Sequence, residues 1–177
     1  MSRIYSMWLS MDEPAKSSLA RIITQLCSEY NAVPFEPHLT LISGKFDDFN
    51  DLVIQIDQFF EDFSPLVLSI QKINFSEDFF KTLFLQFESS NQLNSLYQRA
   101  KSTLTKTRSK VFFPHISLLY KNMHIKEKEK LSQSITLTLT QVCLNQIKIV
   151  TPKKNDTDWY DIENWHVIYK SSIKRSI

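Results

Sequence analysis

Two short segments carry residue types that could do chemistry together, His38-Leu39-Thr40 and His115-Ile116-Ser117. In a β-strand the side chains of residues i and i+2 point to the same face, so each segment would present an imidazole beside a hydroxyl. An imidazole titrates near neutral pH and can act as a general acid or base, while a hydroxyl can hold a non-bridging phosphate oxygen. Two such pairs facing one groove would suit the hydrolysis of a phosphodiester without a metal ion.

These segments are the centres of an internal repeat. Residues 35–42, Phe-Glu-Pro-His-Leu-Thr-Leu-Ile, align with residues 112–119, Phe-Phe-Pro-His-Ile-Ser-Leu-Leu, at four identical and three conservative positions. A single His-x-Thr is weak evidence for a site, but two copies in matched contexts favour a paired role. The flanking strands and helices repeat too, which predicts a single domain over residues 1–177, built of two duplicated, pseudo-symmetric lobes with the groove between them.

Hydrophobic periodicity predicts the elements that must position the repeat. Helices are expected over residues 14–29, 48–60, 91–106 and 126–134, and strands over residues 3–11, 37–42, 66–75, 83–87, 115–120, 137–150 and 165–170. The strands over 66–75 and 83–87 are expected to form a hairpin, and Gly44 is expected to end the strand that follows His38. The predicted fold class is α+β, in which each lobe is an antiparallel sheet with outer helices.

The chain contains one glycine, Gly44, among 177 residues. Walker loops and dinucleotide fingerprints need several glycines for close backbone approach to phosphate, so both are excluded. A formal net charge of +2 is too small to imply a stable nucleic-acid partner. No apolar run is long enough to indicate a secretory signal or a membrane span. We therefore expect a cytoplasmic monomer in which Cys27 and Cys143 are buried, reduced thiols rather than a disulfide.

The double motif resembles the 2H phosphoesterase superfamily, and the chain is similar in particular to its cyclic phosphodiesterase-like proteins. The resemblance covers nearly the whole chain. Besides the two motifs it rests on Tyr5-Ser6-Met7-Trp8-Leu9, on Phe79-Phe80 before Leu83-Phe84-Leu85, on Tyr120, and on Glu163-Asn164-Trp165. It implies the fold of the 2H phosphoesterases, also called the RNA ligase LigT-like fold, with the active site between two lobes.

The resemblance also implies an activity and roles for single residues. Members of this family open ADP-ribose 1″,2″-cyclic phosphate, which comes from tRNA splicing, to the 1″-phosphate, and nucleoside 2′,3′-cyclic phosphates to 2′-phosphates. By this resemblance His38 and His115 are the acid–base pair, with His115 as the base, and neither a cofactor nor a metal is needed. The residues implied to contact the small cyclic-phosphate substrate are Thr40, Ser117, Tyr120, Trp8 and Phe80.

Some alternatives remain open at the level of sequence. A metal site built on the two motif histidines lacks further ligands, because His124 and His166 are interpreted as surface or packing residues and no HExxH or CxxC is present. The basic residues before the second motif are either a solvated helix end or a patch that attracts a phosphorylated substrate. These are Lys101, Lys106, Arg108 and Lys110.

The substrate also has alternatives. The loop Ser76-Glu77-Asp78 is bulkier than in the relatives, which leaves substrate choice at the groove open. A phosphodiesterase of this kind could act instead on RNA 2′,3′-cyclic ends or on cyclic or 2′,5′-linked oligonucleotides. A non-catalytic nucleotide-binding module is a further alternative, against which the retention of all four motif residues argues.

Overall fold

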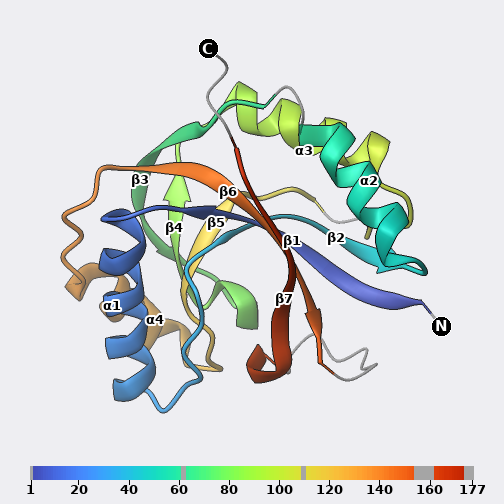
Figure 1. Ribbon diagram of the computed structural model, residues 1–177. Coiled ribbons are helices and arrows are strands. Elements are labelled where there is room, and N and C mark those ends of the chain that lie inside the picture. Colours follow the sequence, from blue (N-terminus) through green and yellow to red (C-terminus); the bar gives the residue numbers. More distant parts are fainter. Residues whose placement is uncertain (1, 61–62, 109–110, 154–161, 174–177) are drawn as a thin grey trace.

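The computed structural model describes residues 2–60, 63–108, 111–153 and 162–173 (Figure 1). Lys110 and most of the loop after residue 152 lie outside this part of the chain. Within it no helix is both long and apolar enough to cross a membrane. The elements in chain order are β1 (Arg3–Met11), α1 (Ala15–Glu29), β2 (Leu39–Phe46), α2 (Phe49–Phe60), β3 (Leu66–Phe75), the 3₁₀ helix η1 (Phe79–Lys81), β4 (Leu83–Phe87), α3 (Asn91–Thr103), β5 (His115–Leu119), α4 (Ile125–Ser134), β6 (Gln141–Pro152), the 3₁₀ helix η2 (Ile162–Asn164) and β7 (Trp165–Ser172).

The described strands form one antiparallel sheet with the order β1-β2-β5-β4-β3-β6-β7, and β1 also pairs with β6. Strand β6 has β1 along one edge and β3 followed by β7 along the other, since Ile147 pairs with both Leu9 and Ser171. Strands from both halves of the chain are therefore hydrogen-bonded in the same sheet. The predicted α+β class with antiparallel strands and outer helices is confirmed. The division into two duplicated lobes stays a prediction.

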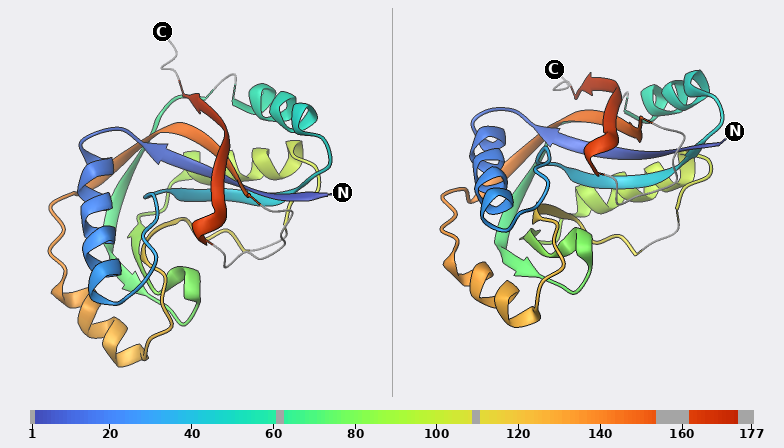
Figure 2. Two further views of the ribbon diagram at one scale, coloured as in Figure 1. Left: turned by 60° about the horizontal axis from the view of Figure 1, so that its bottom comes forward. Right: turned by 90° about the horizontal axis from the view of Figure 1, so that it is seen from below.

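The helices lie in two groups at opposite ends of the sheet (Figure 1). Helix α1 contacts β5 and α4 contacts β3, while α3 contacts β2 and α2 lies against α3. Figure 2 shows from two further sides that α1 and α4 stay together, away from α2. Strand β1 explains how the core forms, because its alternating residues Tyr5, Met7, Leu9 and Met11 are fully buried. The intervening Trp8 is left on the opposite face, where it lines a pocket.

Gly44 does not end β2, which continues to Phe46. Its role is a close approach between two segments. A Cβ atom at this position would lie 2.8 Å from the Lys106 carbonyl oxygen and 2.9 Å from Cε1 of Tyr5. The absence of that atom lets residues 106–108 pair with β2, through Lys45 N–H to Lys106 O at 3.1 Å and Arg108 N–H to Ser43 O at 2.7 Å. A glycine inside a strand marks such a contact as readily as a strand end.

Two other expected boundaries also differ. Helix α3 ends at Thr103 instead of residue 106, because the chain turns extended at Leu104 and reaches β2. Strand β6 begins at Gln141 and not at residue 137. Leu137 and Leu139 alternate as in a strand, but they pack against the core without joining the sheet. Cys27 is buried as expected, whereas Cys143 is half-buried, and both are free thiols.

Candidate active site

The two His-x-Thr/Ser segments meet at the start of two neighbouring strands. Leu39 in β2 pairs with Ile116 in β5, and this is the pairing that joins the two strands. Extending the antiparallel register by one residue sets His38 opposite Ser117 and Thr40 opposite His115. A pseudo-twofold axis thus passes between Leu39 and Ile116. It relates each imidazole–hydroxyl pair to the other, so residues far apart in the chain form one site.

Each motif imidazole is oriented by a backbone carbonyl two residues earlier. Nδ1 of His38 lies 2.6 Å from the Glu36 oxygen, and Nδ1 of His115 lies 2.7 Å from the Phe113 oxygen. A carbonyl oxygen only accepts hydrogen bonds, so the proton must sit on Nδ1 in both rings. In the neutral ring this leaves Nε2 as a lone-pair acceptor. Both histidines are therefore presented in the tautomer that can take a proton at Nε2.

Two aromatic rings, those of Trp8 and Phe35, contact the imidazole of His38. The indole of Trp8 stacks on its imidazole with 3.6 Å between ring centroids and 10° between planes. Phe35 approaches the same imidazole edge-on at 6.4 Å and also stacks on Tyr120 at 3.9 Å. Trp8 pairs with Thr40 across β1 and β2, so the indole and the hydroxyl lie on one face. Trp8 and Tyr120, which the resemblance implies as substrate contacts, both line the pocket that contains His38.

The counterpart of Trp8 on the His115 side is Phe84, which sequence reasoning did not single out as a site residue. Phe84 pairs with Ser117 across β4 and β5, as Trp8 pairs with Thr40. Its ring packs edge-on against His115 at 5.4 Å between centroids, and it is 2% exposed. The signal that would have found it is its place beside the second motif in the repeat. Detecting it needs the strand register, which the sequence alone does not give.

Ser117 connects strand β5 to the loop that carries Phe80. Its hydroxyl donates to the Phe80 carbonyl at 2.6 Å, and a side-chain hydrogen bond joins it to Tyr120. The Phe80 ring packs edge-on against Tyr120 at 5.3 Å. Burial raises the pKa of the Tyr120 hydroxyl, so this group stays protonated and can donate. Ser117, Phe80 and Tyr120 thus form one connected side of the site.

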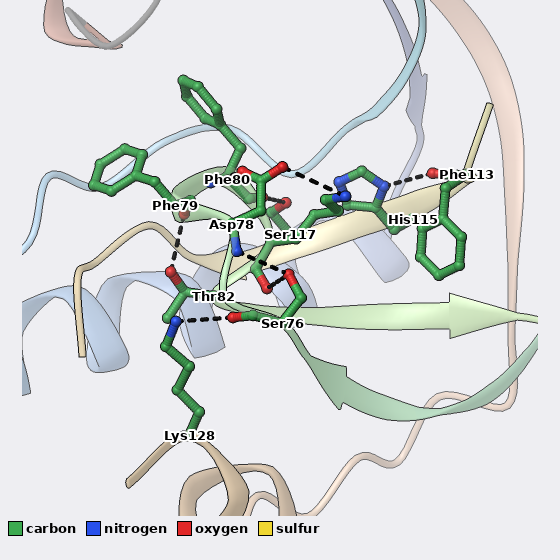
Figure 3. A network of polar contacts seen from close by, with 10 residues as sticks. Ser76, Asp78, Phe79, Phe80, Thr82, Phe113, His115, Ser117 and Lys128 are labelled. Atoms are coloured by element: carbon green, nitrogen blue, oxygen red, sulfur yellow. Dashed lines mark hydrogen bonds and ion pairs between the residues drawn. The ribbon is translucent and has the colours of Figure 1, made fainter. Parts of the chain in front are cut away.

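The loop between β3 and β4 is held in place by a polar network (Figure 3). The Asp78 carboxylate accepts from Phe80 N–H at 2.9 Å, and the Ser76 hydroxyl donates to the Lys81 carbonyl at 2.9 Å. The buried Lys128 ammonium donates to the Ser76 carbonyl at 2.8 Å. In Figure 3 the Asp78 carboxylate also faces the ring nitrogen of His115 that points away from Phe113. The bulky loop noted in the sequence therefore reaches the second imidazole.

All seven residues expected at the site line one pocket of about 510 Å³. They are Trp8, His38, Thr40, Phe80, His115, Ser117 and Tyr120. The same pocket is lined by residues that were not expected there, including Ser6, Ser43, Asp78, Lys81, Phe113 and Trp165. Arg108, from the basic stretch before the second motif, lines it too. His124 precedes α4 and His166 lies in β7, both away from this pocket.

The electrostatics of the pocket favour neutral histidines. Burial lowers the pKa of His38 to about 4, against the opposing effects of the Glu36 carbonyl and carboxylate. Burial also lowers the pKa of His115, which the Phe113 carbonyl and Asp78 oppose and which Lys81 reinforces. Among the described residues no group of three or more His, Cys, Asp or Glu side chains converges as a metal site. The arrangement offers two bases, two hydroxyls and a phenol around one cavity.

Comparison with known proteins identifies the family of the chain. Residues 3–172 match the family described as cyclic phosphodiesterase-like protein. The chain is 20% identical over 171 residues to the cyclic phosphodiesterase of Arabidopsis thaliana, covering 93% of this chain and 92% of the relative.

Solved structures of Escherichia coli LigT share the fold. LigT in its apo form has a TM-score of 0.62 at 9% identity, covering 99% of both chains. LigT in complex with phosphate has a TM-score of 0.60 at 10% identity, and LigT in complex with NADP⁺ has 0.64 at 10%, each covering 98% of this chain and 99% of LigT. Because the family match extends over nearly the whole chain, the protein is a phosphodiesterase that belongs to the cyclic phosphodiesterase-like family of the 2H phosphoesterase superfamily.

Proposed function

We propose that the protein hydrolyses ADP-ribose 1″,2″-cyclic phosphate to ADP-ribose 1″-phosphate, and nucleoside 2′,3′-cyclic phosphates to 2′-phosphates, by acid–base catalysis between His38 and His115. The observation that carries the proposal is the shared orientation of the two imidazoles. Both hold Nδ1–H on a backbone carbonyl and both line the same pocket, so Nε2 is the nitrogen of each ring left for proton transfer, with that of His115 beside the Asp78 carboxylate (Figure 3).

The proposed reaction is one in-line displacement at phosphorus. His115 Nε2 takes a proton from water as the water oxygen forms its bond to phosphorus. The bond from phosphorus to the departing ribose oxygen breaks, and protonated His38 gives its Nε2 proton to that oxygen. For the nucleoside substrate the departing group is O3′, and the product is the 2′-phosphate. After the reaction His115 carries the extra proton and His38 is neutral, and exchange of protons with solvent restores the starting state of both rings.

The negative charge of the phosphate has hydroxyl partners in this scheme. Thr40 and Ser117 sit beside the opposite imidazoles by the antiparallel register and donate to the two non-bridging oxygens. Ser117 donates to the Phe80 carbonyl in the free protein, so phosphate must compete for that donor. Tyr120, which stays protonated, supports the same side through its bond to Ser117. An anion bound here also raises the lowered pKa of His38 and makes its protonation easier.

The far end of the pocket favours a substrate with a second anionic group. A bulge in the β1–β2 pairing makes Ser6 pair with Ser43 while Trp8 pairs with Thr40, so Ser43 shares a face with Thr40. The hydroxyls of Ser6 and Ser43 lie 3.1 Å apart, and Arg108 is tied to Ser43 through its backbone. Three residues of strand separate this end from Thr40 by about 10 Å. The diphosphate of ADP-ribose would reach it when the cyclic phosphate lies between the histidines.

Product analysis by phosphorus NMR tests the function. The panel contains ADP-ribose 1″,2″-cyclic phosphate, the 2′,3′-cyclic mononucleotides and an RNA with a cyclic phosphate end, each with wild-type protein and with His38→Ala. The expected result is conversion of the small substrates to single monoesters by wild type alone. Turnover of the RNA in preference to both small substrates would favour the oligonucleotide function, and binding without turnover of any member would indicate a binding module.

A further inference from the structure

The two copies of the motif differ in chemical class at one position. Glu36 and Phe113 occupy equivalent places, and each supplies the carbonyl that receives Nδ1–H of its histidine. Phe113 packs its ring near His115 and edge-on against Phe84. Glu36 instead carries a carboxylate, whose partners are the ammonium groups of Lys148 and Lys16. A charged side chain next to a pocket lined by aromatic rings needs a partner of opposite charge.

The partner of Glu36 is a buried cation in β6. Lys148 in β6 is 5% exposed, and its ammonium contacts the Glu36 carboxylate. Lys16 of α1 reaches the same carboxylate at 2.9 Å from the more exposed side, and the Ser10 hydroxyl approaches it at 3.4 Å. Burial disfavours the charge on Glu36, but the hydrogen bonds from Lys148 and Lys16 outweigh it and hold the pKa of this carboxyl below its ordinary value. The ion pair is therefore formed near neutral pH.

The pair is connected to His38 from two directions. Through Glu36 it fixes the residue whose carbonyl oxygen lies 2.6 Å from Nδ1. Through the sheet it adjoins Trp8, because Lys148 and Trp8 pair across β6 and β1 and therefore point to the same face. Trp8 in turn stacks on the His38 ring. The Glu36 carbonyl thus holds the edge of the imidazole and Trp8 covers its face. Lys148 lies next to both Glu36 and Trp8.

We infer that Glu36 and Lys148 form a clasp that positions His38, holding its ring with Nδ1–H on the Glu36 carbonyl and Nε2 toward the pocket. Neither residue lines the pocket, so both are positioning residues and do not touch substrate. The second motif uses the packing of Phe113 in place of an ion pair. The inference rests on the proposed function only in giving His38 a proton-transfer role. The clasp itself can be tested without substrate.

Glu36→Gln and Lys148→Met test the clasp. Each should lower kcat by about tenfold to a hundredfold with KM changed by less than about threefold, because loss of a ring's orienting partner affects proton transfer more than binding. Long-range proton–nitrogen NMR of the imidazoles should show that His38 no longer holds its proton on Nδ1 alone. The charged and titratable groups acting on His38 are Glu36, His115 and Lys148. Its pKa should therefore fall in Glu36→Gln and rise in Lys148→Met.

Three further variants separate positioning from folding. Lys16→Met removes the exposed cation from the same carboxylate and should leave kcat and the His38 tautomer as in wild type. Lys148→Arg keeps the charge and should restore most of the activity. The double variant Glu36→Leu/Lys148→Met removes the buried lysine charge together with its half-buried partner, so it should fold as well as wild type, yet it should retain the kcat defect.

Two results would overturn the clasp. One is a wild-type tautomer and pKa of His38 in both Glu36→Gln and Lys148→Met. The other is a loss of kcat that only follows the folded fraction, with an unchanged pH profile. If wild type turns over no cyclic phosphate, the proposed function fails, but the NMR spectra of the same variants still decide whether Glu36 and Lys148 orient the ring.

Discussion

The indole of Trp8 lies flat on the imidazole of His38, with the two planes 10° apart and the ring centroids 3.6 Å apart. This contact covers one face of the imidazole, and burial is the largest cause of the lowered pKa of His38. Trp8→Ala should therefore let water reach the ring and raise the pKa of His38 from about 4 toward 6.5. Titration of the His38 carbon-bound protons by NMR measures it. The control is Phe79→Ala, which removes a ring that contacts Tyr120 and not His38. An unchanged pKa of His38 in Trp8→Ala would mean that other groups desolvate it.

The two histidines should behave as one unit in turnover. His38→Ala and His115→Ala should each cut kcat by roughly 10² to 10⁴, and the double variant should be far less than multiplicative. With His38 as the acid, a substrate with a thio leaving group needs little protonation, so it should rescue His38→Ala and not His115→Ala. Rescue of His115→Ala alone would exchange the two roles. Rescue of neither would reject the acid–base division.

The lowered pKa of His38 links stability to pH. The unfolded chain binds a proton at His38 near pH 6.5, whereas the folded chain does so only near 4. The contribution of this group to the free energy of unfolding is therefore fully present above pH 6.5 and is lost as the pH falls toward 4. The shift of 6.5 to 4 corresponds to about 3 kcal/mol. Urea unfolding at several pH values should show a shallower loss in His38→Asn than in wild type, and equal slopes would contradict the shift.

Arg108 should discriminate between the two proposed substrate classes. Arg108→Met should raise KM for ADP-ribose 1″,2″-cyclic phosphate by about tenfold or more, as for a lost charged hydrogen bond. The KM for a 2′,3′-cyclic mononucleotide, which lacks the diphosphate, should change less than about twofold. Arg99→Met is the matched control, since that guanidinium lies over the rings of Phe59 and Phe63. Equal losses with both substrates would place the effect of Arg108 elsewhere.

Activity should persist in EDTA and should not rise with added zinc or manganese. The expectation rests on the ligand set of the site, because no three His, Cys, Asp or Glu side chains converge among the described residues. Initial rates before and after dialysis against EDTA measure it. A rate that is abolished by the chelator and restored by one metal would replace the two-histidine scheme with metal-assisted hydrolysis.

The pairing of an imidazole with a hydroxyl in each motif was predictable, because residues i and i+2 of any strand point to the same face. The period of two puts His38 beside Thr40 and His115 beside Ser117 wherever the strands lie. Trp8, Phe80 and Tyr120 came from the family resemblance, since an aromatic side chain in an apolar strand is as typical of the core. All three line the pocket, and their contact with substrate stays a prediction.

What could not be predicted depends on pairing between distant strands. The position of Lys148 opposite Trp8 comes from the β1–β6 register, and that of Phe84 beside His115 comes from the β4–β5 register. Gly44 was misassigned for the same reason, because the close approach of Lys106 involves a segment distant in sequence. Nothing in the sequence singles out Glu36, because the buried Lys148 that binds its carboxylate lies 112 residues away.

The pairing of Leu39 with Ile116 has a consequence for product isomers. A cyclic phosphate centred on the pseudo-twofold axis meets an imidazole and a hydroxyl from either side, so turning the ring over would exchange its two ester oxygens between equivalent groups. The motif residues alone do not choose which ester bond opens. That choice depends on the residues around the motifs, which are not the same on the two sides. Trp8 beside Thr40 corresponds to Phe84 beside Ser117, and Arg108 lines only one end of the pocket. Regioselectivity in this fold can therefore drift or be redesigned while the four motif side chains stay unchanged.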